Sequence, residues 1–182
     1  PHDLERAGVP CLYFGDFFER PEVRDLLSLF SVVSEPKGTG LLRVAQMPHY
    51  AVPVEDIAKV VAWRRDKKLA MLAALRQANT IDGLSAAGRD GLRRLVADTA
   101  RWTWPMLPHQ FLIGYLFGSG NHARECLSGD GVPDQQRRLA VYQLLQFAFA
   151  FKPPEKEDPK RAFLNHVRRL EILDEEKQLR QL

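Results

Sequence analysis

Apolar residues recur along most of this chain at the three- and four-residue spacing of an amphipathic helix. Between residues 21 and 33 these positions are Val23, Leu26, Leu27 and Phe30. Further stretches with helical character are 41–46, 53–63, 69–79, 85–104, 108–117, 121–127 and a last one that begins at residue 159. The pattern therefore predicts a series of helices joined by short loops.

Proline and turn-forming residues mark where several of these helices begin and end. Pro21, Pro53 and Pro159 each stand at the first position of a predicted helix, where the missing N–H would have no partner in any case. The segment 35–40 is rich in turn residues and separates the first helix from the rest. We therefore expect a boundary at residue 36.

Two segments depart from the amphipathic pattern. The stretch 135–151, which includes Leu144 and Leu145, is apolar nearly all round, and such a helix is expected at the centre of a bundle. The short apolar run 11–14, bounded by Pro10 and Gly15, predicts a strand without a partner in this chain. The sequence thus predicts an all-α fold, mainly a helical bundle, with one short N-terminal strand.

Composition adds little to this picture. The chain has 182 residues, 45% of them hydrophobic, and a formal net charge of +3. This length suits one substantial domain, or one domain with a fragment of another. The mildly basic balance permits contact with nucleic acid without requiring it.

Cysteine usage and hydropathy predict a cytoplasmic protein. Cys11 and Cys126 lie far apart and form no pattern of metal-ligand spacing, so we expect free thiols and no metal site. No apolar run reaches about 18 residues, so no membrane span is expected. The chain begins at Pro1 without a methionine, and we expect it to be a segment of a longer protein.

The stretch from Gly15 to Asp25 resembles a segment of UvrD/Rep-type superfamily 1A DNA helicases. It follows a Gly-Val-Pro turn at residues 8–10, as in those enzymes, and Arg43-Val44 is similar to the pair that opens their accessory 2B subdomain. The later helices follow the order of that subdomain. The motif positions that match are Gly15, Phe17, Phe18, Arg20, Glu22, Val23 and Asp25.

This resemblance implies a partial RecA-like 2A segment in 1–36, with the strand as its remnant, and a 2B-like helical accessory subdomain in 37–182. The parent protein would be an ATP-dependent 3′-to-5′ DNA helicase that uses ATP and Mg²⁺. The accessory region would pivot against the motor domains and modulate unwinding. Its partners would be duplex DNA or other repair or regulatory proteins.

The ATPase motifs of such an enzyme are not in this chain. A Gly-x-x-x-x-Gly-Lys-(Ser/Thr) loop does not occur, and neither does an Asp-Glu pair after an apolar strand. Gly38-Thr39-Gly40 and Gly118-Ser119-Gly120 are too short to hold phosphate and are expected to be turns. We therefore expect no catalytic residue and no bound cofactor here, and no ATPase activity from this chain alone.

The candidate nucleic-acid contacts fall into three groups. Arg20 belongs to the matched motif, although an ion pair with Glu22 or Asp25 is an alternative. His49 and Tyr50 stand where the family's duplex-contacting turn would be, but residues 47–54 lack the glycines that let backbone amides approach phosphate. The third group is a basic run that could bind phosphates, although a solvated helix end is the preferred interpretation: Arg64, Arg65, Lys67 and Lys68.

A second class of function is a helical protein-interaction module without a nucleic-acid role. A basic stripe that joins residues 64–68 to the arginine pairs at 137–138 and 168–169 would favour DNA. A wide apolar patch would favour a protein partner. Aromatic residues could stack on bases, but core packing is our preferred interpretation for Phe17, Phe18, Trp102 and Trp104.

Overall fold

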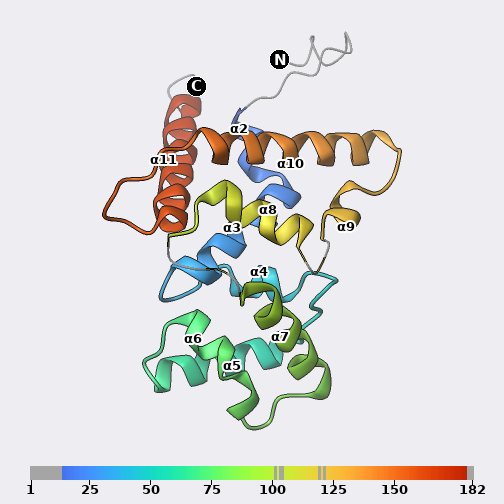
Figure 1. The fold of residues 1–182 in the computed structure, drawn as a ribbon, viewed down its shortest axis with the longest axis vertical. Coiled ribbons are helices and arrows are strands. Elements are labelled where there is room, and N and C mark those ends of the chain that lie inside the picture. Colours follow the sequence, from blue (N-terminus) through green and yellow to red (C-terminus); the bar gives the residue numbers. More distant parts are fainter. Residues whose placement is uncertain (1–13, 101, 103–104, 119, 121, 180–182) are drawn as a thin grey trace.

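The computed structural model of the chain describes residues 14–100, 102, 105–118, 120 and 122–179 (Figure 1). Within these ranges the fold is all-α, as the sequence predicts, and none of the helices is both long and apolar enough to span a lipid bilayer. The helices are α2 (Phe14–Glu19), α3 (Pro21–Ser34), α4 (Leu41–Ala45), α5 (Val54–Asp66), α6 (Met71–Arg76), the 3₁₀ turn η1 (Ala78–Thr80), α7 (Ala86–Thr99), α8 (Pro108–Phe117), α9 (Ala123–Leu127), α10 (Val132–Ala150) and α11 (Pro159–Leu179).

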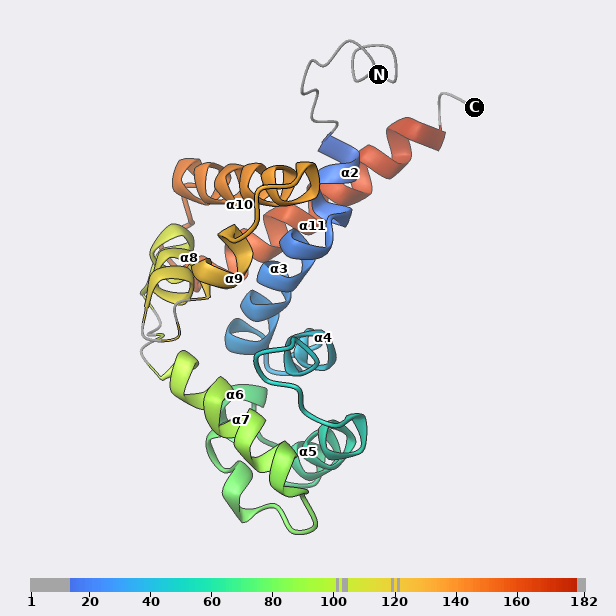
Figure 2. The same ribbon diagram turned by 90° about the vertical axis from the view of Figure 1, so that its right-hand side faces the viewer.

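The helices form two groups stacked along the long axis of the molecule (Figures 1 and 2). The lower group consists of α4–α7, and the upper group of α2 and α8–α11. Helix α3 connects them, because it packs against α4 and α6 below and against α2, α10 and α11 above. A single hydrophobic core runs through both groups along this helix.

Helix α3 is buried on several sides because its sequence is apolar at almost every inward position. Leu29, Phe30 and Val32 are fully buried. The Phe30 ring lies 4.4 Å from Phe111 of α8 and 5.2 Å from Phe163 of α11, measured between ring centroids. Such aromatic contacts add to the burial of the rings themselves.

Helix α10 lies at the outside of the upper group, which corrects the expectation that it is the central helix (Figures 1 and 2). Its inner face packs on α8, α9 and α3. Its outer face leaves Leu139, Tyr142 and Phe149 exposed to solvent. The central position belongs to α3, which has neighbours on both sides, so apolar residues on every side of α10 do not imply neighbours on every side. The inner face consists of Ala140, Val141, Leu144 and Ala148.

The short N-terminal strand is not found among the described residues. Residues 11–13 of that prediction lie outside the described part of the chain, and Phe14 is the first residue of helix α2. A helix is favoured here because it turns Phe17 and Phe18 into the core, where they are 4% and 3% exposed. The Phe18 ring meets Phe147 of α10 edge-on at 5.9 Å. The interpretation of both rings as core residues is therefore confirmed.

The segment after α3 is a turn tied to the last helix. Arg168 of α11 donates two hydrogen bonds to the Glu35 carboxylate, and Ser31 donates a third. Although partial burial opposes ionisation, these bonds hold the pKa of Glu35 below its ordinary value. The domain boundary expected at residue 36 stays a prediction.

Candidate functional site

The predicted basic run covers the end of α5 and the turn that follows it, in the lower helix group (Figure 1). Arg64 is half-buried and donates to the Pro36 and Leu69 carbonyls at 3.2 and 3.3 Å, so its guanidinium holds two loops together. Arg65, Lys67 and Lys68 are exposed, and Lys67 lies 3.4 Å from Asp66. These three cations are the members of the run that face solvent.

The other arginine pairs lie on α10 and α11, in the opposite half of the molecule (Figure 1). Arg137 pairs with Asp134 at 3.1 Å, and Arg138 donates to the Leu127 carbonyl at 3.1 Å. Arg168 is paired with Glu35. The three groups therefore do not form one continuous basic stripe.

Arg20 lies between α2 and α3, half-buried, with its Nε atom 2.5 Å from a Glu22 carboxylate oxygen. This is the ion pair that the sequence offered as the alternative to a nucleic-acid contact. Its partner Glu22 lines the cleft described below.

His49 and Tyr50 lie on the loop between α4 and α5, where the backbone is held from two sides. Arg94 of α7 donates to the His49 carbonyl at 3.0 Å and to the Tyr50 carbonyl at 3.1 Å. Ala51 then takes a left-handed conformation, with φ of 47°, and the Val52 N–H donates to the Ala45 carbonyl at 2.8 Å. The Tyr50 side chain is fully buried and has no surface to offer DNA.

The two ring side chains of this loop converge on Asp98 of α7. The Tyr50 hydroxyl donates to Asp98 Oδ2 at 2.9 Å. His122, at the start of α9, places its Nε2 atom 2.8 Å from the same oxygen, and His49 places its Nε2 atom 3.5 Å away. Burial opposes the charge on Asp98, but the bonds from His122 and Tyr50 lower the pKa of this carboxyl below its ordinary value.

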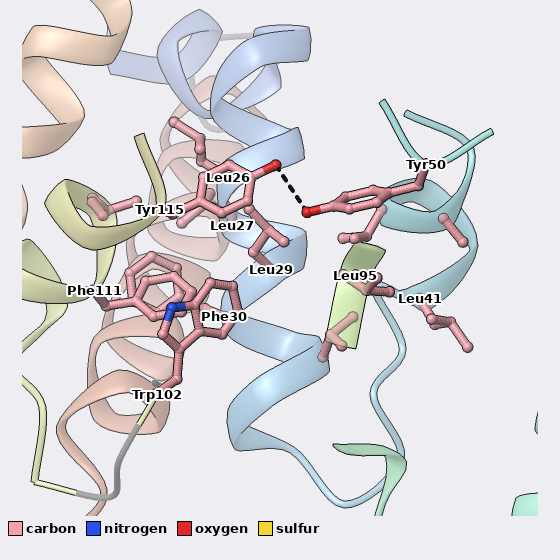
Figure 3. Packing of buried hydrophobic residues seen from close by; sticks show 14 of the residues in the cluster. Leu26, Leu27, Leu29, Phe30, Leu41, Tyr50, Leu95, Trp102, Phe111 and Tyr115 are labelled. Carbon is pink, nitrogen blue, oxygen red and sulfur yellow. Dashed lines mark hydrogen bonds between the residues drawn. The ribbon is translucent and has the colours of Figure 1, made fainter. Parts of the chain in front are cut away.

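Aromatic contacts fix the orientation of these rings. The His122 ring stacks on Tyr115 of α8 with centroids 4.3 Å apart and an interplanar angle of 12°. The His49 ring meets the His122 ring edge-on at 4.2 Å. Figure 3 shows Tyr50 reaching toward Tyr115, and their hydroxyl oxygens are 3.5 Å apart. Burial, followed by the neighbouring Tyr115 and Asp98, raises the pKa of Tyr50 far above its ordinary value.

Gly120 passes close to this cluster. A Cβ atom at Gly120 would lie 2.5 Å from His122 Nε2 and 3.0 Å from Asp98 Oδ1. The first distance is too short for a real Cβ atom, and the second is tighter than most real Cβ contacts. The backbone therefore covers the cluster closely on this side.

On another side the cluster opens into a cleft of about 360 Å³. Met47, His49, Tyr115 and His122 line one part of this cleft. The remaining lining residues come mainly from the start of α3 and include two carboxylates: Pro21, Glu22, Asp25, Leu26, Pro48 and Arg137. His49 is half-buried and His122 is buried. Histidines beside a carboxylate at the edge of such a cleft are able to bind a metal ion or exchange a proton.

Sequence reasoning finds His49 and Tyr50 but not Asp98, Tyr115 or His122. Asp98 and His122 are 24 residues apart and lie on different elements, so no motif spacing joins them. No protein-family model and no curated protein matches this chain.

Proposed function

We propose that this chain is the 2B-like accessory region of a UvrD/Rep-type ATP-dependent DNA helicase, preceded by part of its 2A domain. The observation that supports this most is an ion pair between Asp25 of α3 and Arg43 of α4, at 2.5 Å. Both residues carry the resemblance, from two separate phrases of the sequence. Arg43 also donates to the Pro21 carbonyl at 3.1 Å.

This ion pair gives a physical reason why the two sequence segments, 15–25 and 43–44, occur together. The carboxylate and the guanidinium fix the angle at which the chain leaves α3 and enters α4. The apolar positions of the same phrases lie in the core: Phe17, Phe18, Val23 and Val44.

In this proposal the chain contacts duplex DNA weakly through exposed cations and supplies no ATPase chemistry. Arg65, Lys67 and Lys68 would act as point charges toward phosphate, which makes the binding dependent on salt and independent of base sequence. ATP and Mg²⁺ would bind to other parts of the parent helicase. DNA-stimulated ATP hydrolysis by the purified chain would contradict this assignment.

The test is a titration of fluorescent duplex DNA at several salt concentrations. Replacing Arg65, Lys67 and Lys68 by glutamine should flatten the slope of log affinity against log salt by about 2–3, since each phosphate contact contributes about 0.9. A matched variant loses the same charge from the upper group, at Lys152, Lys156 and Arg169, and should keep the wild-type slope. Equal slopes for all three proteins would show that Arg65, Lys67 and Lys68 do not contact DNA.

One observation favours the second class of function, a protein-interaction module. Tyr142 and Phe149 on the outer face of α10 are 58% and 69% exposed. Leu139 lies on the same helical face and is also exposed. Large apolar side chains in this position are typical of surfaces that contact another protein.

The two functions can be separated by experiment. Two results together would favour protein contact through α10. The chain would fail to bind duplex even at low salt, and the Tyr142→Ser and Phe149→Ser substitutions would lower its sedimentation coefficient. Salt-dependent duplex binding that these two substitutions leave unchanged would favour the DNA role.

A further inference from the structure

We propose that His49, Asp98 and His122 form a binding site for one divalent transition-metal ion, with Zn²⁺ as the best-matched probe. One ligand atom from each of these residues lies within 4.8 Å of the other two. None of its residues belongs to the matched segment 15–25 or to the Arg43-Val44 pair, although His49 stands where the helicase family's duplex-contacting turn would be. Zn²⁺ binding at these three side chains does not require that the chain bind DNA. The site also differs from the sequence-based expectation, which found no metal site.

The ligand set determines the kind of ion. Two imidazole nitrogens with one carboxylate oxygen suit Zn²⁺ and neighbouring first-row ions, whereas Mg²⁺ and Ca²⁺ prefer oxygen ligands alone. Three protein ligands leave a fourth position of a tetrahedral ion for water or a substrate atom. Here that position would face the cleft, since His49 and His122 both line it.

The geometry needs only small side-chain movements to receive an ion. The Nε2 atoms of His122 and His49 are 2.8 and 3.5 Å from Asp98 Oδ2. An ion with bonds of about 2 Å to each ligand would take the place of these two contacts. Both histidines already direct the same nitrogen toward the same carboxylate.

Neighbouring side chains hold the ligands in place. Tyr50 donates to Asp98 at 2.9 Å, and Tyr115 stacks on the His122 ring. Arg94 fixes the backbone of His49 through its carbonyl. Such supporting contacts orient metal ligands and commonly change affinity about 10–100-fold when they are removed.

The three ligand side chains are largely buried, but the site stays accessible from the cleft. The side chains of His122, Asp98 and His49 are 5%, 11% and 26% exposed. An ion here would join three segments that are distant in sequence: the α4–α5 loop, α7 and the start of α9. Binding should therefore also stabilise the fold.

The experiment uses the whole chain with Cys11 and Cys126 replaced by serine, so that thiolates do not contribute. After treatment with a chelator, calorimetric titration with Zn²⁺ should give one ion per chain, and Mg²⁺ should give no heat of binding. At a hundredfold excess over Kd, Zn²⁺ should raise the Tm by about 5–10 °C. Absence of Zn²⁺ binding would overturn the proposal.

Variants locate the ion. His49→Gln and Asp98→Asn should each weaken Zn²⁺ binding at least about tenfold, and Tyr50→Phe should weaken it about 10–100-fold by releasing Asp98. His166→Gln, on α11, is the matched control and should bind as the parent protein does. Wild-type affinity in both His49→Gln and Asp98→Asn would show that the ion lies elsewhere.

A second measurement requires no variant at these positions. The chain has five histidines. Imidazole nitrogen resonances of two of them should shift when Zn²⁺ is added, and the shifting pair should contact each other in nuclear Overhauser spectra, as His49 and His122 do. A shift of one histidine, or of two without mutual contacts, would overturn the site.

Discussion

Gly91 of α7 lies directly against the backbone carbonyl of Tyr50. A Cβ atom at this glycine would come within 2.3 Å of the Tyr50 oxygen and 2.7 Å of Val52 Cγ2. The contact lets α7 approach the α4–α5 loop closely enough for Arg94 to bind the His49 and Tyr50 carbonyls. The candidate site therefore depends on a residue that carries no side chain.

Gly91→Ala should lower the free energy of unfolding by about 1–3 kcal/mol, because backbone atoms must move to make room. Gly114→Ala is the matched control, since it lies in α8 and a Cβ there would meet nothing within 4 Å. This control should be neutral or stabilising by up to about 1 kcal/mol, the usual gain from glycine to alanine in a helix. Urea unfolding of both variants measures the difference. Equal effects would mean that α7 is not held against the loop in this way.

Asp56 should make the fold sensitive to acid. Its carboxylate is buried and accepts hydrogen bonds from the Ser85 hydroxyl and backbone N–H, while the Ser85 hydroxyl accepts from Gly88 N–H at the start of α7. Burial opposes the charge on Asp56, but the bonds from Ser85 and Lys59 lower its pKa below the ordinary value. A lowered folded-state pKa stabilises the protein above the unfolded-state pKa, and this stability is lost as the pH falls through the folded-state pKa.

Asp56→Asn should therefore lower the free energy of unfolding by about 1–3 kcal/mol at neutral pH. Its stability should also fall less steeply than that of the wild type as the pH is lowered into the acid range. Glu55→Gln is the control, because Glu55 is exposed on the same turn. Denaturation midpoints from neutral to acid pH provide the measurement. Parallel curves for Asp56→Asn and wild type would contradict the assignment.

Lys68 follows Lys67, the residue that caps the C-terminus of α5, and has a left-handed conformation with φ of 54°. The Leu69 N–H donates back to the Arg64 carbonyl at 3.0 Å. Glycine is the favoured residue at this position of a helix end. Lys68→Gly should therefore raise the free energy of unfolding by about 0.5–1 kcal/mol. Lys67→Gly, one residue earlier with φ of −80°, should instead be neutral or destabilising. A gain in both variants would point to the loss of positive charge as the cause.

The two faces of α10 should respond differently to truncation. Leu144 is fully buried, so Leu144→Ala should lower the free energy of unfolding by about 2–5 kcal/mol. Leu139 is 38% exposed on the outer face, and Leu139→Ala should cost much less. Guanidinium unfolding of both variants tests this arrangement. Similar losses would indicate that the outer face is covered by another surface.

Local sequence signals predict several helices well. Pro108 and Gly118 bracket α8, which the pattern predicts at its observed bounds. Ser85 is predicted as the start of α7 and accepts the Gly88 N–H as its cap. Both signals are local because proline, glycine and serine act on the backbone within one turn.

The tertiary features could not be predicted in the same way. The outer position of α10 depends on α3 occupying the centre. The hydrophobic periodicity of α10 carries no information about where α3 lies. Helix α2 has six residues, too few to show a helical period. The cluster around Asp98 combines a loop, a mid-chain helix and the first residue before α9. These segments are distant in sequence, so only the tertiary fold brings their side chains together.

The position of α3 between the two helix groups also determines how the protein unfolds. Its residues Leu29 and Phe30 are fully buried and belong to the core that both groups share. If α3 opens, each group loses one wall at the same time, so neither should persist as a separate folding unit. Amide protons of α3 should consequently exchange with solvent only through global unfolding, with the slowest rates in the chain.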